Sequence, residues 1–167
     1  TRLLMVSWAR RCVYETGLGE IEELVEITKK EGAKVLIGGK RPSGFNKGYF
    51  YEPTVFDDVD DNFTIMKTEP FGPLVPMLSF KSFDEVVERA NNNDLGLCSY
   101  IYTNSMEKAH KASELMETGC VAVNTPTVAI AEAPFGGIKQ TGYGREGGSM
   151  AIKDYLNIKY THLGLKT

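Results

Sequence analysis

The chain has 167 residues, which fits one domain and is enough to bury a hydrophobic core without metal or disulfide staples. Its 42% hydrophobic and 25% charged residues are ordinary for a soluble globular protein, and its net charge of −3 comes from interspersed acidic and basic residues. No basic stripe indicates nucleic-acid binding, and no apolar run reaches the roughly 18 residues of a membrane span. We therefore expect no nucleic acid and no membrane among its partners.

The cysteines and histidines argue against several kinds of site. Cys12, Cys98 and Cys120 show neither zinc-ligand spacing nor an obvious pair. Cys98 and Cys120 lie in apolar segments, where a free cysteine behaves as a small hydrophobic residue. His110 and His162 have no nearby serine or cysteine partner. We expect no metal site, no histidine-based nucleophile, and a reducing, cytoplasmic compartment.

The first element that the sequence predicts is a helix over Glu20–Lys30. Residues of one face recur at i, i+3, i+4 and i+7, and glutamates near the start and lysines near the end complement the helix dipole. Gly32 ends the helix. The residues expected to face the core are Ile21, Leu24, Val25 and Thr28.

Two strands are predicted next, over Lys34–Ile37 and Tyr49–Phe56, the second because it is rich in aromatic and β-branched residues. Pro53 has no N–H for a strand ladder, so the second strand is at an edge, bulged or interrupted there. The acidic stretch Asp57–Asn62 is expected to be a solvated loop rather than a metal site. Thr64–Thr68 is expected to form one helical turn.

The segment from Leu74 to Val123 alternates between strand-like and helix-like stretches. Short connections between such stretches predict right-handed crossovers and parallel strand pairing. We therefore expect an α/β fold with an open, mostly parallel twisted sheet and flanking helices. The predicted strands are Leu74–Phe80, Leu97–Tyr102 and Cys120–Val123, and the predicted helices are Ser82–Asn92 and Ser105–Glu117.

A start signal marks the helix over Ser82–Asn92. Ser82 and Glu85 have the spacing of a capping box, in which each side chain accepts a hydrogen bond from an otherwise unpaired backbone N–H. The residues expected to face inward from this helix are Val86, Val87 and Ala90.

A glycine-rich segment, Ala133–Gly148, follows the last of these strands and holds six of the chain's 17 glycines. Glycine admits positive φ and close backbone approach, so we expect sharp turns here, after an irregular loop, Thr125–Glu132, that a strand carries. The segment contains the G-x-G-x-x-G spacing of a dinucleotide-binding turn, but no strand feeds it and Lys166 stands where an acidic residue belongs. A tight connection is therefore the preferred interpretation.

The end of the chain is predicted to form a short helix over Ser149–Tyr155 and a strand over Leu156–Leu163. The second segment alternates apolar and polar residues with period two. A solitary terminal strand of this kind needs a partner, either in this chain or in another subunit.

Three side chains beside proline and glycine are candidates for ligand contact. Glu69 lies before a Pro-Phe-Gly-Pro turn that fixes its direction, and a carboxylate held in this way can accept hydrogen bonds from a diol such as ribose. On these residues alone, a surface glutamate is the preferred interpretation. Phe71 and Phe135 each precede a glycine; core packing is the first interpretation for both, and a ligand-facing wall is the alternative.

Several of these motifs, in this order, resemble the C-terminal third of the NAD(P)-dependent aldehyde dehydrogenases. They are EPFGP, ERANNNDLGLCSYIYT, GCVAVN and above all APFGGIKQTGYGREGG, and GAKVLIGG and GYFYEPTVF fit the same register. The resemblance runs from about Gly19 to about Leu163, is strongest to the succinate-semialdehyde type, and leaves Thr1–Leu18 unmatched. It implies a partial catalytic domain over residues 1–155 and an oligomerisation strand and tail over 156–167.

The resemblance also implies roles for single positions. Glu69 resembles the carboxylate that holds the hydroxyls of the nicotinamide ribose, which makes cofactor contact the preferred interpretation of this residue. Phe71 resembles the aromatic residue beside the nicotinamide. Phe135 would line the aldehyde tunnel, and Leu156–Leu163 resembles the strand that joins the oligomerisation sheet.

The loop at the mouth of the tunnel corresponds to Thr127–Ile130, so Thr127, Ala129 and Ile130 are the positions expected to contact the tail of the substrate. In succinate-semialdehyde enzymes a serine in this loop helps to bind the distal carboxylate of the substrate. Ala129 and Ile130 occupy that neighbourhood here, which argues against a dicarboxylic-type substrate.

The matched segment lacks the family's catalytic machinery. The nucleophilic cysteine, the general-base glutamate and the nucleotide-binding domain all lie upstream of it in the family. Cys12 is the only cysteine before Glu69, and its surroundings, ARRCVY, differ from the family's cysteine loop. We therefore expect no catalytic residue in this chain, no activity of the isolated chain, and no tight binding of NAD or NADP by it.

Two functions follow from the resemblance. The first is a fragment, or a split or truncated gene product, of an enzyme that oxidises an aldehyde or a semialdehyde to the carboxylic acid with NAD(P)⁺. The second is a non-catalytic α/β module that associates with itself, or with a longer homologue, through Leu156–Leu163.

Overall fold

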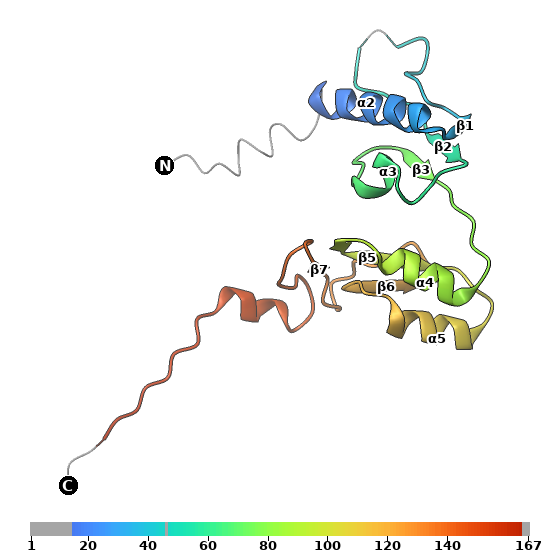
Figure 1. The fold of residues 1–167 in the computed structure, drawn as a ribbon. Helices are drawn as coiled ribbons and strands as arrows, with labels where there is room; N and C mark the ends of the chain where they lie inside the picture. The colour runs from blue at the N-terminus through green and yellow to red at the C-terminus, as the bar shows by residue number, and fades with distance from the viewer. Residues whose placement is uncertain (1–14, 46, 165–167) are drawn as a thin grey trace. The chain divides into compact units, whose positions relative to one another are not determined.

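The computed structural model describes residues 15–45 and 47–164 and divides the chain into two compact units, Thr1–Phe80 and Lys81–Thr167 (Figure 1). The length of the chain suggested one domain, so the division is a finding of the structure. Cys12, which the sequence analysis considered as a nucleophile, lies outside the described residues. Within the described residues, each unit combines helices with short strands, as an α/β fold requires.

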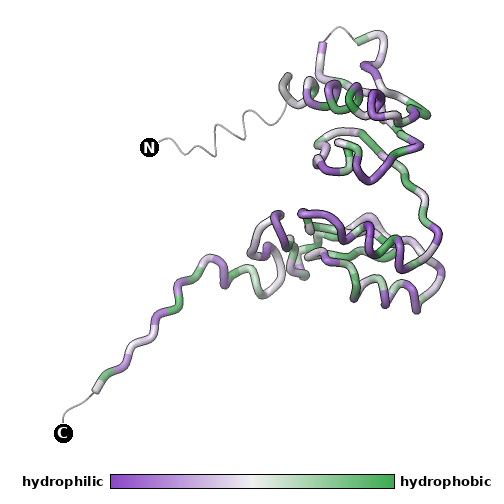
Figure 2. Tube along the Cα trace, viewed as in Figure 1, coloured by the Kyte–Doolittle hydropathy of each residue, from purple (hydrophilic) through white to green (hydrophobic). Residues whose placement is uncertain are grey.

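The first unit is built on helix α2 (Glu15–Glu31), which contains the predicted helix and begins five residues before it. All four residues predicted to face the core are buried. The hydroxyl of Thr28 donates to the Leu24 carbonyl at 2.7 Å, so this buried polar side chain is satisfied within the helix. Figure 2 shows hydrophobic and hydrophilic residues alternating around α2.

The sheet of the first unit has the order β1-β2-β3. Strand β1 (Lys34–Ile37) is antiparallel to β2 (Thr54–Asp57), and β2 is parallel to β3 (Leu74–Pro76). The predicted strand over Tyr49–Phe56 is correct only in its last part, because the ladder begins after Pro53, which has no N–H to donate. Strand β3 ends near the point at which its partner β2 ends, so it covers only the first part of the predicted Leu74–Phe80.

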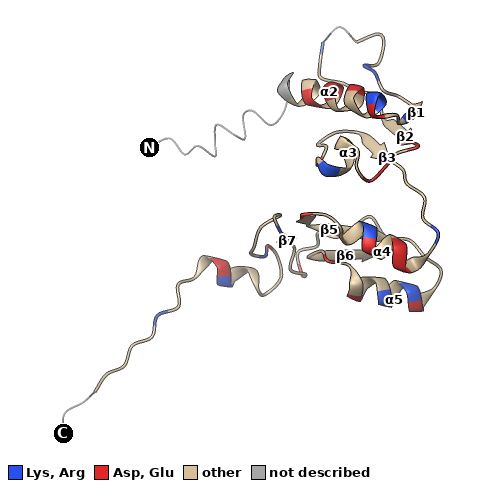
Figure 3. Ribbon diagram, in the orientation of Figure 1, with Lys and Arg blue, Asp and Glu red and all other residues tan. Residues whose placement is uncertain are grey.

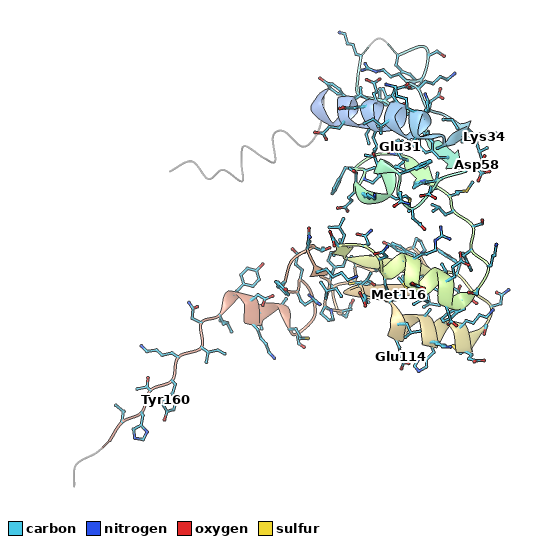
Figure 4. The ribbon with its side chains drawn as sticks, viewed as in Figure 1. Glu31, Lys34, Asp58, Glu114, Met116 and Tyr160 are labelled. Carbon is cyan, nitrogen blue, oxygen red and sulfur yellow. The ribbon has the colours of Figure 1, made fainter. Side chains whose placement is uncertain are left out.

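The core of the first unit lies between α2, the sheet and helix α3 (Thr64–Lys67). Phe56 of β2 is 0% exposed and packs in one cluster with Val25 of α2 and Ile65 of α3. The carboxylate of Glu31 accepts hydrogen bonds from the backbone N–H and the hydroxyl of Thr64, so the end of α2 caps the start of α3 (Figure 4).

The described residues of the second unit form two parallel strands, two α-helices and a short antiparallel pair. Strands β5 (Cys98–Ile101) and β6 (Cys120–Val123) are parallel, with α5 (Met106–Leu115) between them in the chain. The antiparallel pair is β4 (Leu95–Gly96) and β7 (Ile138–Lys139). The remaining elements are α4 (Phe83–Asn91) and the 3₁₀ helix η1 (Ala151–Tyr155).

The start of α4 confirms the predicted capping box. The Ser82 hydroxyl accepts from the Glu85 N–H at 3.1 Å, and the Glu85 carboxylate accepts from the backbone of Lys81, at 2.8 Å, and from that of Ser82, which together lower the pKa of Glu85. Val86 and Val87 are partly buried, but Ala90 is exposed, so the prediction that Ala90 faces inward is wrong. Figure 3 shows acidic and basic residues interspersed along α2, α4 and α5.

The described strands form three small sheets rather than one mostly parallel sheet. The α/β class is confirmed, and the pair β5–β6 is parallel as predicted; β2–β3 is also parallel, although β2 lies outside the segment for which parallel pairing was predicted. The pairs β1–β2 and β4–β7 are antiparallel, and β3 pairs with β2 rather than with the strands that follow it. The alternation of elements therefore predicted the connection from β5 through α5 to β6 correctly, but the expected crossover from β3 through α4 to β5 is wrong, because β3 and β5 lie in different sheets.

The predicted terminal strand Leu156–Leu163 does not pair with any described residue of this chain. Every residue from 156 to 164 is exposed, and none lies in a ladder. Tyr160 extends from this segment, and its ring stacks against His162 at 6.4 Å between centroids (Figure 4). The sequence allowed two kinds of partner for this strand, one in the same chain and one in another subunit. The first is not found among the described residues.

The substitution Phe56→Ala tests the core of the first unit. Removing a fully buried ring leaves a cavity beneath α2, so we expect the free energy of unfolding to fall by about 3–5 kcal/mol. Urea unfolding followed by circular dichroism measures the change. Phe80→Ala is the matched control, because Phe80 is 56% exposed and its truncation leaves no buried cavity. Equal losses in the two variants would contradict this description of the core.

Candidate active-site segments

The first candidate segment is the irregular turn Glu69–Pro73, which joins α3 to β3. Gly72 lies against the side chain of Ile21 on α2 so closely that a Cβ at this position would overlap it. The carbonyl of Pro73 accepts from the Thr54 N–H at 2.8 Å, at the start of β2. The second half of the turn is therefore anchored on buried residues of the core.

The side chains of the first half of the turn point away from that core. Phe71 is 88% exposed, so the interpretation of this ring as a core residue is wrong. Glu69 is exposed, and no hydrogen bond or ion pair joins it to another of the described residues. An anchored turn thus presents one carboxylate and one aromatic ring, separated by Pro70, and the roles predicted for Glu69 and Phe71 stay predictions.

The second candidate segment surrounds a pocket of about 380 Å³ in the second unit. Phe135 lies at its wall and is partly buried. The backbones of Phe135 and Glu146 exchange two hydrogen bonds, each of 2.7 Å, and so fold the glycine-rich segment back on itself. The other lining residues are Leu97, Gly136, Gly137, Thr141, Gly142, Tyr143, Gly144, Arg145, Asp154 and Tyr155.

Glycine is required at the contacts between this segment and its neighbours. A Cβ at Gly119, where β6 begins, would overlap the carbonyl oxygen of Gly136. Gly147 has φ +69°, and a Cβ there would lie 2.7 Å from the Ala133 carbonyl oxygen. The loop before Phe135 is therefore held by backbone packing that any larger side chain would disrupt.

The dinucleotide-binding interpretation of Gly142, Gly144 and Gly147 finds no support in the structure. The strand before these glycines, β7, has two residues, and the element after them is a five-residue 3₁₀ helix rather than an α-helix. A dinucleotide-binding turn needs an α-helix whose N-terminus faces the phosphates. The glycines instead form the tight connection that the sequence predicted.

Arg145 and Asp154 hold the wall of the pocket, which the sequence did not predict. The guanidinium Nη1 of Arg145 donates to the carbonyls of Gly137 and Gly144 at 2.8 and 2.7 Å. The Arg145 N–H donates to the Asp154 carboxylate at 2.7 Å. The sequence offered only a general indication of these contacts. Turns rich in positive φ expose backbone carbonyls, and a nearby cationic side chain can donate hydrogen bonds to them.

Lys139 ties the same segment to α4. Its ammonium donates to the carbonyls of Asn91 and Asn93 at 2.8 and 3.0 Å, at the C-terminal end of α4, where unpaired carbonyls attract a cation. It also pairs with Glu117 at 2.6 Å. Lys139 has φ +56°, a backbone conformation that these contacts stabilise.

The predicted mouth loop, Thr127–Ile130, leads into this framework. Thr127, Ala129 and Ile130 are exposed. The Ile130 carbonyl accepts from the Ala133 N–H at 3.3 Å, and the Gly148 N–H donates to the Ala131 carbonyl at 2.8 Å. The structure therefore brings Phe135 and the mouth loop together on one glycine-rich framework, and their substrate contacts stay predictions.

Metal ligands and membrane spans can be assessed for residues 15–45 and 47–164. Among them, no group of three or more histidine, cysteine, aspartate or glutamate side chains is placed to hold a metal ion. None of the helices in this part of the chain has the length and apolar character that crossing a membrane demands.

A strand-borne glycine-rich turn beside a pocket and an anchored carboxylate turn are features of an α/β enzyme, and comparison with known proteins identifies the class. Residues 12–161 match the aldehyde dehydrogenase family, and the chain belongs to that family. The match includes residues 12–18, which the motifs had left outside the resemblance.

The curated relatives include the predicted subgroup and others. The chain is 42% identical over 153 residues to the mitochondrial succinate-semialdehyde dehydrogenase of Arabidopsis thaliana. The aligned region covers 91% of this chain and 28% of the relative. The chain is also 46% identical over 140 residues to retinaldehyde dehydrogenase 3 of Homo sapiens, with 84% and 27% covered. The chain thus spans less than a third of the length of these relatives. Relatives are named as mitochondrial or chloroplastic, so the cytoplasm stays a prediction.

Solved structures agree with this assignment. The NAD⁺ complex of the aldehyde dehydrogenase from Bacillus cereus matches with a TM-score of 0.86 at 42% identity, over 92% of this chain and 31% of that one. The succinate-semialdehyde dehydrogenase from Burkholderia pseudomallei matches with a TM-score of 0.80 at 37% identity, over 85% and 29%.

The substitution Gly119→Ala tests the backbone contact behind the pocket. The added methyl group would overlap the Gly136 carbonyl, so we expect the free energy of unfolding to fall by about 1–3 kcal/mol. Hydrogen exchange of the Phe135 and Glu146 amides should rise at the same time. Gly164→Ala is the control, because nothing lies within 4 Å of a Cβ there. An unchanged unfolding curve for Gly119→Ala would contradict the contact.

Proposed function

We propose that this chain supplies the part of an aldehyde dehydrogenase active site that binds the nicotinamide ribose and lines the tunnel through which the aldehyde enters. The reaction is oxidation of an aldehyde or a semialdehyde to the carboxylic acid, with NAD⁺ or NADP⁺ accepting the hydride. The observation that carries the proposal is the position of Phe135, at the wall of a pocket within a segment that matches the family.

Glu69 and Phe71 are proposed to contact the cofactor. The Glu69 carboxylate is exposed and has hydrogen-bonding capacity for the two hydroxyls of a ribose. Phe71 is exposed on the same anchored turn, and an aromatic face beside a planar ring is a favourable contact. The anchoring of the turn at Gly72 and Pro73 supports this role, because it reduces the entropy lost on binding.

Phe135 and the mouth loop are proposed to contact the aldehyde. Phe135 gives the pocket an apolar wall, and the mouth loop contributes Thr127, Ala129 and Ile130. The four residues Thr127–Ile130 carry no charge. This composition favours an aldehyde whose tail is uncharged over one that ends in a carboxylate.

The nucleophile and the general base are proposed to come from outside this chain. A catalytic cysteine needs to be a thiolate, and burial together with the neighbouring Cys120 raises the pKa of Cys98. Cys98 and Cys120 both lie on strands of the β5–β6 sheet rather than on a loop beside Phe135. We therefore propose that the isolated chain has no dehydrogenase activity and binds neither cofactor tightly.

A chimera tests the proposed role of Glu69. Residues 12–161 of this chain replace the matching segment of the Bacillus cereus aldehyde dehydrogenase, and formation of reduced nicotinamide is followed by its absorbance. In this chimera, Glu69→Gln should lower kcat/KM for the cofactor by roughly 10- to 100-fold, because a charge-assisted contact to the ribose is lost. Glu88→Gln, at another exposed glutamate, is the control and should leave kcat/KM unchanged.

The same assay distinguishes the proposed division of labour from its alternatives. The isolated chain should form no reduced nicotinamide with aldehyde and NAD⁺ or NADP⁺. Robust turnover by the isolated chain would contradict the claim that the nucleophile lies elsewhere. Equal activity of the Glu69→Gln and Glu88→Gln chimeras would remove Glu69 from the cofactor site.

A second candidate function is association through Leu156–Leu163, and one observation favours it. This segment alternates apolar and polar residues, and its apolar members Ile158 and Tyr160 are among the most exposed side chains of the described chain. An unpaired strand with such a pattern pairs readily with another chain. The proposed partner is a second copy or a longer homologue, with or without catalysis.

Light scattering after size exclusion tests the association. We expect the chain to be oligomeric at micromolar concentration, and Ile158→Asp to shift it to the monomer because a charge replaces an apolar side chain in the proposed interface. Lys159→Ala is the control on the opposite side of the segment. A strictly monomeric parent chain would end this proposal without affecting the roles of Glu69 and Phe135.

A further inference from the structure

Two cysteines lie directly opposite each other in the second unit. Strands β5 and β6 are parallel, and Cys98 is the register partner of Cys120. Neighbouring strands lie about 4.7–4.9 Å apart, and residues in register point to the same face of the sheet. A disulfide joins Cα atoms that are about 4.4–6.8 Å apart, so the Cα spacing of this register lies within the range that a bond between the two side chains needs.

The two thiols are free and interact with each other. Both cysteines are partly buried, and neither is part of a disulfide. Burial raises the pKa of Cys98, and the Cys120 side chain raises it further through its charge and a hydrogen bond. Each cysteine by itself matches the sequence-based prediction of a small hydrophobic residue, but the pairing of the two does not follow from that prediction.

The pair is connected to the pocket through a single contact. The Cys120 thiol donates to the carbonyl of Gly136 at 3.7 Å. Gly136 lines the pocket beside Phe135, and the same carbonyl lies against Gly119, the residue before Cys120. Loss of the thiol proton would therefore remove one of the contacts that position the backbone beside Phe135.

We propose that Cys98 and Cys120 form a redox-active pair that closes to a disulfide by exchange with a low-molecular-weight disulfide and thereby loosens the backbone at Gly136. This inference does not depend on the proposed enzymatic function. In the first step, the Cys120 thiolate attacks a sulfur of the small disulfide, because burial raises the pKa of Cys98 and so disfavours its thiolate; this forms a mixed disulfide on Cys120 and releases one small thiolate.

In the second step, the other cysteine attacks the protein sulfur of the mixed disulfide, which forms the Cys98–Cys120 bond and releases the second small thiolate. The two protein thiols lose two protons and two electrons in total. The small disulfide is reduced to two thiols, so the exchange is balanced. A small dithiol reverses it by the same steps.

The reaction is tested on the full chain carrying Cys12→Ser, treated with oxidised glutathione. We expect peptide mass spectrometry to find a disulfide between Cys98 and Cys120 that dithiothreitol removes. In the further variants Cys98→Ser and Cys120→Ser, the remaining cysteine should carry glutathione instead. Separate glutathione adducts on both cysteines of the parent chain, or no modification at all, would overturn the proposed pair.

The link to the pocket has its own readout. In the disulfide form, the amides of Phe135 and Glu146 should exchange hydrogen roughly 2- to 5-fold faster than in the reduced form, because a weak thiol–carbonyl contact is lost. Reduction should restore the slow rate. Amides of α2 in the other unit are the internal control and should not change. Unaltered exchange at Phe135 and Glu146 would overturn the coupling to Gly136.

Discussion

The second unit depends on a close approach between two stretches of backbone. At the start of β6, the Gly119 N–H donates to the Gly96 carbonyl at 3.0 Å, while the Cα of Gly119 faces the Gly136 carbonyl with no room for a side chain. One glycine thus joins β4, β6 and the glycine-rich segment. Since Phe135 precedes Gly136, the position of the pocket wall follows from this contact.

The first unit uses the same device at its own candidate segment. Gly72 lies against Ile21 of α2, which is buried, and the next residue accepts a hydrogen bond from Thr54 of β2. In both units a glycine allows a close contact beside an aromatic residue, Phe71 or Phe135, for which ligand contact is proposed. A rigid scaffold with outward side chains is the usual arrangement of functional loops.

Local signals in the sequence predicted local structure well. The period of α2, the Ser82 cap and the single turn of α3 depend on residues a few positions apart, and each is confirmed. Strand pairing depends on residues far apart in the chain, so the lengths of β2 and β3 and the division into three sheets were not predictable. The contacts of Lys139 with Asn91 and of Cys98 with Cys120 could not be predicted for the same reason, because no local pattern in the sequence identifies the partner residue.

The exposure of the candidate residues bears on how the site works. A single exposed aromatic ring such as Phe71 is ordinary on a protein surface, so its exposure alone does not indicate a ligand. Its position on an anchored turn means that a ligand in contact with it would have little further backbone to order. Phe135 differs, because its backbone bridge to Glu146 and its pocket already hold the ring partly buried. The wall proposed for the aldehyde is thus already formed in this chain, whereas the surface proposed for the nicotinamide is exposed in it.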